Sequence, residues 1–172
     1  MATPDHFSRF GLARRYAVDR KALDSAYERL SFAHHPDLFA SAPPEQRLEA
    51  ERAAASINEA YRVLSSDLDR AGYLLSLLAE GRKLNTEALP PGFLAAMFAL
   101  QEEIEELNPA DASARARLRG EVQERMEKVL ADRATLFAGL TQGSGPAAEG
   151  ALQAVQGNLN EERYLRRLLE RL

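Results

Sequence analysis

Two successive segments carry apolar residues at helical spacing, and this pattern limits the possible folds more than any other feature. In residues 19–35 the apolar positions follow one another at steps of four and three, with Asp19 as a suitable N-cap. The same steps recur in residues 47–66. Two amphipathic helices joined by a loop of about ten residues pack antiparallel. Their stripes predict a first core made of Leu23, Tyr27, Leu30, Ile57, Tyr61 and Leu64.

The first helix of this hairpin meets the tripeptide His35, Pro36 and Asp37. A residue that precedes proline is pushed out of the α region, and proline cannot donate the next helical hydrogen bond. We therefore expect the helix to end at His34 or His35 and the next one to open at Pro43 or Pro44. A helix stop followed by a turn is a common role for such residues, so the tripeptide alone leaves its function open.

The helical period continues to the end of the chain, with no alternating strand pattern of useful length. A helix over 67–80 completes a first unit, residues 1–80, and the Gly- and Pro-rich residues 81–92 form a linker. Residues 93–172 hold three further helices, over 93–107, 111–140 and 151–172. The predicted fold is all-α. The predicted core of the second unit is Leu94, Met97, Leu100, Ile104, Leu118, Val122, Met126, Val129, Leu152, Leu159, Leu165 and Leu168.

Composition excludes several classes of protein. The chain has no cysteine, which excludes disulfide frameworks, thiol catalysis and cysteine-ligated zinc and suits a reducing cytoplasm. A net charge of −4 argues against nucleic acid as a partner. The longest apolar stretch, near residues 73–79, is far shorter than the roughly 20 residues of a membrane span, and the first residues lack the apolar run of a signal peptide. We expect a cytoplasmic protein with no nucleic-acid or membrane partner.

An enzyme that uses His35 and Asp37 as acid and base is the first alternative, because histidine titrates near neutral pH. No activated nucleophile, glycine-rich phosphate loop or metal-binding cluster accompanies the pair. The chain has only three histidines, and His34 and His35 are adjacent, so they point to different sides of a helix. We expect no enzymatic activity, no cofactor and no bound metal.

Charge is distributed unevenly along the chain. Between Arg9 and Leu30 six basic residues face three acidic ones, a local charge of +3 in a chain whose total is −4. A solvated helix face is one explanation of this charge. A surface that steers an acidic partner toward the adjacent loop is the other.

The helix over 93–107 is apolar and then acidic. Most of its apolar residues fit a core stripe, and its glutamates fit a solvated face. Phe98 lies off the stripe and is the residue that separates a packing role from a binding role.

Several segments together resemble one family, the HscB-type J-domain co-chaperones of iron–sulfur cluster assembly. The segments are HFSRFGLARRYAVDRKAL, HHPDLFA, SINEAYRVLSSDLDRAGYLLSL and FLAAMFALQEEIEEL, and the resemblance covers nearly the whole chain. It implies that residues 1–80 are a J-domain that engages a DnaK/HscA-type chaperone and stimulates its ATPase. It also implies that residues 93–172 bind an IscU-type cluster scaffold protein and that the whole molecule is L-shaped.

The resemblance also implies site residues. The chaperone-binding residues would be the loop His35, Pro36 and Asp37 with the docking charges Arg14, Arg15, Arg20, Lys21 and Arg29. The scaffold-binding residues would be Leu94, Ala95, Phe98, Ala99, Glu102, Glu106 and Tyr164.

The chain departs from the family pattern at a few of these positions. Leu38 stands where J-domains often carry lysine, and His34 stands where tyrosine is common. Ala95 and Ala99 make the proposed scaffold patch thinner. These changes bear on the affinity for partners.

Two further functions stay open at this point. One is a general J-domain co-chaperone with another client, although the chain lacks a Gly/Phe-rich linker and a cysteine-rich zinc module. The other is a plain helical interaction scaffold in which His-Pro-Asp only stops a helix. A functional loop requires that His35 and Asp37 be exposed to solvent.

Overall fold

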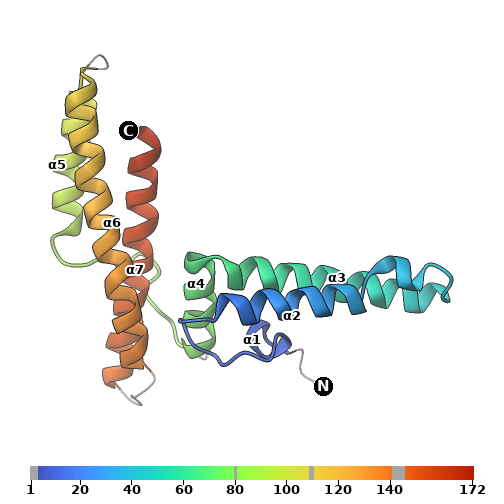
Figure 1. Ribbon diagram of the computed structural model, residues 1–172. Coiled ribbons are helices and arrows are strands. Elements are labelled where there is room, and N and C mark those ends of the chain that lie inside the picture. Colours follow the sequence, from blue (N-terminus) through green and yellow to red (C-terminus); the bar gives the residue numbers. More distant parts are fainter. Residues whose placement is uncertain (1–3, 80, 109–110, 141–145) are drawn as a thin grey trace. The chain divides into compact units, whose positions relative to one another are not determined.

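Every regular element in the part of the chain that the structure describes is a helix, as predicted (Figure 1). The structure is a computed structural model that describes residues 4–79, 81–108, 111–140 and 146–172. The chain divides into two units, Met1–Leu74 and Leu75–Leu172. The division falls inside one helix, α4 (Asp67–Ala79), whereas the predicted boundaries at 80 and 93 remain a proposal.

The first unit is a helical hairpin with a short helix added at its start. Helices α2 and α3 lie side by side, and α1 packs against α3 (Figure 1). The elements of this unit are α1 (His6–Arg9), α2 (Arg20–Ala33), the 3₁₀ turn η1 (Pro36–Phe39), α3 (Pro44–Ser65) and the first part of α4.

The ends of the hairpin helices follow the local signals in the sequence. The Asp19 carboxylate accepts hydrogen bonds from the backbone N–H groups of Lys21 (2.9 Å) and Ala22 (3.2 Å), as an N-cap does. Helix α2 ends at Ala33 with His34 as its C-cap, and α3 begins at Pro44. All three predictions are confirmed.

The core of the hairpin agrees with the apolar stripes only in part. Leu23, Ile57 and Leu64 are buried as predicted. The other three predicted core residues, Tyr27, Leu30 and Tyr61, are only half-buried, so their assignment to the core is wrong. For the two tyrosines the cause is polar: Tyr27 donates a hydrogen bond to Asn58 Oδ1 and Tyr61 donates one to Asp24 Oδ1, which keeps both hydroxyls near the surface.

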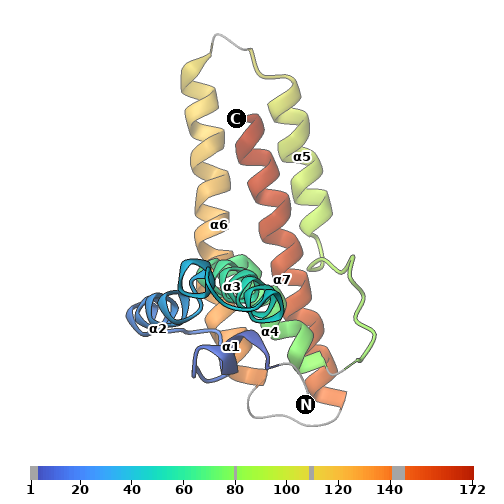
Figure 2. The same cartoon turned by 90° about the vertical axis from the view of Figure 1, so that its right-hand side faces the viewer.

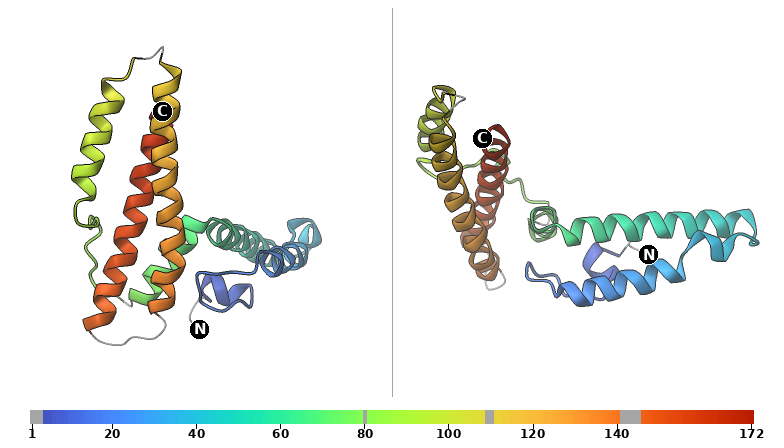
Figure 3. Two further views of the ribbon diagram at one scale, coloured as in Figure 1. Left: turned by 60° about the vertical axis from the view of Figure 1, so that its left-hand side comes forward. Right: turned by 45° about the horizontal axis from the view of Figure 1, so that its top comes forward.

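The second unit contains a long helix pair with a shorter helix beside it. Helices α6 (Ala112–Leu140) and α7 (Pro146–Arg171) pack against each other along their length (Figure 2). Helix α5 (Phe93–Glu105) runs beside only one half of that pair, as both Figure 2 and the left view of Figure 3 show. Helix α7 begins at Pro146 rather than at the predicted residue 151, because proline is well tolerated in the first turn of a helix.

Most of the predicted second core is confirmed. Its core positions on α6 and α7 are buried except Met126, which is half-buried, as is Ile104 on α5. Leu94 is wrong as a core residue, since 49% of its surface is exposed. The inward stripe of α5 starts at Phe93 and continues through Met97 and Leu100 at steps of four and three, which turns Leu94 outward.

A buried polar network joins α6 to α7, and no periodic pattern in the sequence predicts it. Arg133 and Glu162 are both fully buried and form an ion pair. Arg133 Nε donates to Asn158 Oδ1 (2.9 Å), and Asn158 Nδ2 donates to the carbonyl of Val129 (2.8 Å). Arg166 Nε donates to Glu162 Oε1 (2.7 Å) from the surface side.

Candidate partner-binding surfaces

The His35–Asp37 loop is a short, stiff and exposed turn. His35 has an extended backbone (φ −65°, ψ 129°), and Pro36 then opens η1. The backbone N–H of Asp37 donates to His35 Nδ1 (3.3 Å), and the Asp37 carboxylate lies 3.6 Å from the same nitrogen. The side chains of His35 and Asp37 are 56% and 88% exposed. The exposure that a functional loop requires is therefore present.

Two large apolar side chains stand next to this loop, one on each side in sequence. Phe32, in the last turn of α2, is 75% exposed, and Leu38, in η1, is 58% exposed. The sequence interpretation did not single out Phe32. The signal was there, because Phe32 falls off the apolar stripe of its helix.

The five basic residues predicted to dock the chaperone fall into two groups. The Arg14 guanidinium bonds the Asp5 carboxylate (2.7 Å). Arg20 bonds the Asp24 carboxylate (3.0 Å), and it also donates to the Tyr61 hydroxyl and the Ser65 carbonyl on α3. Both are therefore engaged within the unit. The other three, Arg15, Lys21 and Arg29, are exposed and make no ion pair with any residue the structure describes.

Asp5 anchors the start of the same unit. Its carboxylate caps α1 by accepting from the N–H groups of Phe7 (2.9 Å) and Ser8 (3.1 Å). Burial opposes ionisation of this carboxyl, but hydrogen bonds from Arg14 and Ser8 outweigh burial, so the pKa of Asp5 lies below its usual value.

Helix α5 presents apolar residues and then acidic ones to solvent. Phe98 is 61% exposed and lies one turn after the half-exposed Leu94. The other predicted members, Ala95, Ala99 and Glu102 on this helix and Glu106 at its C-cap, are exposed as well. Among the described residues, neither Glu102 nor Glu106 has an ion-pair partner, whereas Glu103 pairs with Arg117 and Glu105 with Arg171.

Tyr164 is less available than the other members of the predicted scaffold patch. It is half-buried, and its ring packs edge-on against Phe93 with 5.6 Å between ring centroids. Its hydroxyl donates to Gln101 Oε1 (3.3 Å). The Tyr164 ring thus packs against the buried side of α5, and only part of this side chain is exposed to solvent.

The described residues contain neither a metal-binding cluster nor a membrane-spanning helix. Across the described ranges, no group of three or more His, Cys, Asp or Glu side chains could hold a metal ion. No helix in those ranges is both long enough and apolar enough to cross a membrane.

Two family models match the chain, one for each part. Residues 5–73 match the model described as "DnaJ domain", and residues 89–172 match the one described as "HSCB C-terminal oligomerisation domain". Solved structures share the fold, among them two HscB proteins. "Chaperone HscB from Vibrio cholerae" has a TM-score of 0.75 and 29% identity over 97% of this chain and 94% of that chain. The human co-chaperone protein HscB has a TM-score of 0.78 and 22% identity over 98% of this chain and 80% of that chain.

Curated relatives agree with the family models. A protein named "Co-chaperone protein HscB homolog" from Cupriavidus taiwanensis is 41% identical over 156 residues, which is 87% of this chain and 84% of the relative. A protein of the same name from Bordetella petrii is 37% identical over 140 residues, covering 80% of this chain and 81% of the relative. The resemblance found in the sequence is confirmed, and the chain belongs to the HscB family of J-domain co-chaperones.

Proposed function

We propose that this co-chaperone stimulates the ATPase of a DnaK/HscA-type chaperone and delivers an IscU-type iron–sulfur cluster scaffold protein to it. The observation that carries the proposal is the exposed His35–Asp37 turn at the tip of a DnaJ-type hairpin. The protein would act in the cytoplasm, and it would have no catalytic activity of its own.

The geometry of the turn suits recognition by another protein. Pro36 restricts the backbone before binding, so less conformational entropy is lost on docking. His35 and Asp37 offer a donor and an acceptor that solvent already reaches. Arg15, Lys21 and Arg29 are the strongest candidates for docking charges, because Arg14 and Arg20 are engaged by their own unit.

The exposed face of α5 is the proposed scaffold-binding surface. Phe98 and Leu94 supply an apolar centre, and Glu102 and Glu106 supply an acidic end. Such a face suits an apolar patch that is edged with basic residues. Ala95 and Ala99 complete it, with Tyr164 at its margin.

One variant tests the proposed scaffold surface separately from the chaperone loop. Phe98→Ser should weaken binding of a purified IscU-type protein in calorimetry while leaving chaperone stimulation in the absence of that protein intact. Leu130→Ser on α6 is the matched control, because Leu130 is also a large exposed apolar residue. Equal affinity of the Phe98→Ser variant and the wild type would refute the proposed scaffold surface.

The alternative candidate partner for the α5 face is a second copy of this chain. The matched C-terminal model is described as an oligomerisation domain, which favours this candidate. Sedimentation velocity over a range of concentrations separates the two. A dimer that is lost in Phe98→Ser, together with unchanged scaffold binding, would assign the α5 face to self-association.

A further inference from the structure

A cavity in the second unit lies apart from both surfaces described above. Helix α5 has 13 residues and α6 has 29, so at 1.5 Å per residue they are about 20 Å and about 43 Å long. The core of α5 packs on the half of the pair that includes Leu118 and Leu165. The other half of α6 and α7 has no part of α5 beside it (Figures 2 and 3).

A non-helical segment with a turn at Thr86 and Glu87 takes the place of a helix along this second half. The N–H of Asn85 donates to Gln153 Oε1, and Gln153 Nε2 donates back to the Asn85 carbonyl, both at 2.9 Å. Farther along, Asn160 Nδ2 donates to the carbonyls of Thr86 (2.7 Å) and Ala88 (2.9 Å). These side chains of α7 fix residues 85–88 against the helix.

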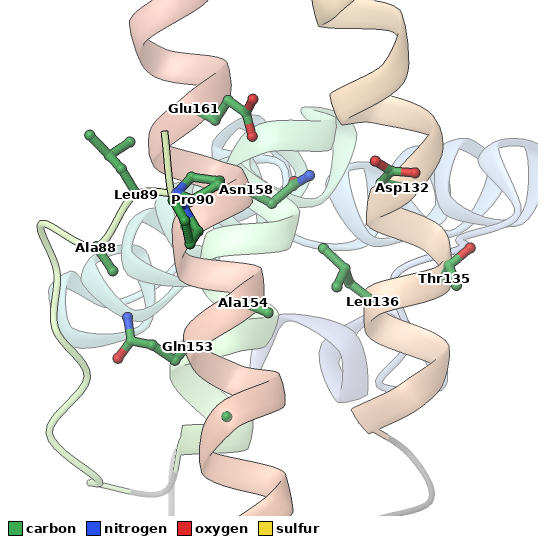
Figure 4. A pocket seen from close by; sticks show the side chains of 13 residues that line it. Ala88, Leu89, Pro90, Asp132, Thr135, Leu136, Gln153, Ala154, Asn158 and Glu161 are labelled. Carbon is green, nitrogen blue, oxygen red and sulfur yellow. The ribbon is translucent and has the colours of Figure 1, made fainter. Parts of the chain in front are cut away.

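The segment and the two helices enclose a cavity of about 590 Å³ (Figure 4). This volume lies within the usual range for ligand pockets. Its walls are largely apolar, with Leu89 and Pro90 from the segment, Leu136 from α6 and Ala154 from α7. Gly150 and Gly157 also line it and add no side chain to the α7 wall.

The two carboxylates of the cavity lie at one end of it. Asp132 from α6 and Glu161 from α7 lie there on facing helices (Figure 4). Neither carboxylate forms an ion pair or hydrogen bond with a residue that the structure describes. Burial raises the pKa of Glu161, which indicates that nearby Arg125 and Lys128 do not compensate its desolvation.

The cavity continues past these two carboxylates. A second hollow shares Pro90, Asp132 and Glu161 with it and extends along α6 as far as Glu121. From residue 121 to residue 136 the groove is about 22 Å long. Its charged lining has four carboxylates (Glu121, Glu124, Asp132 and Glu161) against two cations (Arg125 and Lys128). Because Glu121 also pairs with Arg117, an excess of one negative charge remains.

We propose that this groove binds a short peptide segment of a partner protein in which apolar side chains are followed by basic ones. The apolar residues would fill the cavity between Pro90, Leu136 and Ala154, and the basic residues would lie against Asp132 and Glu161. A length of about 22 Å matches six or seven extended residues. The site shares no residue with the His35–Asp37 loop or the α5 face.

The test uses the full chain and a fluorescein-labelled octapeptide that contains two leucines followed by two arginines. Fluorescence anisotropy should show saturable binding. The same peptide with glutamate in place of arginine, or serine in place of leucine, should bind at least about tenfold more weakly. On addition of the first peptide, the amide signals of Gly150 and Gly157 should shift in ¹⁵N NMR spectra, since both residues line the cavity.

Three variants locate the binding. Ala154→Trp fills the cavity, and the double change Asp132→Asn with Glu161→Gln removes its charge; each should weaken binding at least about tenfold. Ala131→Trp is the control, because Ala131 is exposed on α6 and lines neither hollow. Far-UV circular dichroism should show the same helix content in all variants.

Several results would overturn the proposal. They are no saturable binding of the peptide, equal binding of the glutamate peptide, or equal loss in Ala154→Trp and Ala131→Trp. Self-association that Ala154→Trp abolishes would assign the groove to a second copy of this chain instead. Neither chaperone nor scaffold protein is present in the assay, so its outcome is independent of the proposed function.

Discussion

His35 has an expected role in binding a partner but takes little part in the packing of the fold. Its ring is half-exposed, and the interactions that the structure gives its side chain are with the neighbouring Asp37. Exposed side chains without buried partners contribute little to stability. Its identity should therefore matter for partners and not for folding.

His35→Gln should leave the free energy of unfolding unchanged within about 0.5 kcal/mol and abolish stimulation of the chaperone ATPase. Urea unfolding and steady-state ATP hydrolysis measure the two effects. Gln46→Ala, an exposed change at the start of α3, is the control and should alter neither. A His35→Gln variant that still stimulates would contradict the assignment.

Asp5→Ala should destabilise the first unit by about 1 kcal/mol near neutral pH, because the cap of α1 is lost. The folded-state pKa of Asp5 lies below the unfolded value of 3.8, so this stabilisation is complete above that value. It is lost as the pH falls through the folded pKa. Chemical unfolding at about pH 7 and about pH 2.5 should therefore show a large and then a small difference from wild type.

Asp5→Asn separates the two contributions of this residue. Asparagine caps helices as well as aspartate does, but it cannot form the ion pair with Arg14. Its loss of stability should be smaller than that of Asp5→Ala. An equal loss in both variants would mean that the ion pair, not the cap, stabilises α1.

At the level of elements, the sequence predicted best what local chemistry determines. The N-cap at Asp19, the stop before Pro36 and the start of α3 at Pro44 were confirmed, because each depends on a few neighbouring residues. Helix α1 was missed, since four residues are too few to show a period. The choice between Phe93 and Leu94 was wrong because a step of three and a step of four to Met97 are both helical.

The candidate sites were predictable to a similar degree. The helix stop before Pro36 could be predicted from the proline, whereas the exposure of His35 and Asp37 had to come from the structure. The ion pair of Arg14 and the hydrogen bonds of Arg20 to α3 could not be predicted from the sequence. They depend on Asp5 and on α3, which only the folded unit brings near these arginines. The cavity beside Pro90 was likewise missed, since its walls come from three separate segments.

Leu165 on α7 and Leu94 on α5 give a direct test of which residues around α5 belong to the core. Leu165→Ala should cost about 2–5 kcal/mol, because Leu165 is fully buried in the cluster beneath α5. Leu94→Ala should cost less than about 1 kcal/mol, because half of its surface is already exposed. Urea unfolding of both variants measures the difference. Equal losses of the free energy of unfolding would mean that Leu94 is a core residue after all.

The buried Arg133–Glu162 pair should show strong energetic coupling. Glu162→Leu alone should destabilise by about 3–5 kcal/mol, because it leaves the Arg133 charge buried without its partner. Adding Arg133→Met should recover much of that loss, since two apolar residues can pack where two charges were. A double-mutant cycle by urea unfolding measures the coupling, and additive losses would contradict it.

At the scale of the whole molecule, the chain joins a J-domain to an HscB C-terminal domain. The proposed chaperone loop belongs to the first unit and the proposed scaffold face to the second. The linker over 81–92 and the L shape stay predictions from the sequence. If delivery is the function, the two surfaces must act from one chain, because linkage raises the effective concentration of scaffold at the chaperone.

The most direct measurement of this claim is single-turnover ATP hydrolysis by a DnaK/HscA-type chaperone with the scaffold protein present. We predict that the intact chain and the scaffold stimulate synergistically, and that His35→Gln and Phe98→Ser each remove the synergy. A mixture of these two variants should not restore it, because neither chain carries both surfaces. Full synergy from the mixture, or from the His35→Gln variant alone, would contradict the account.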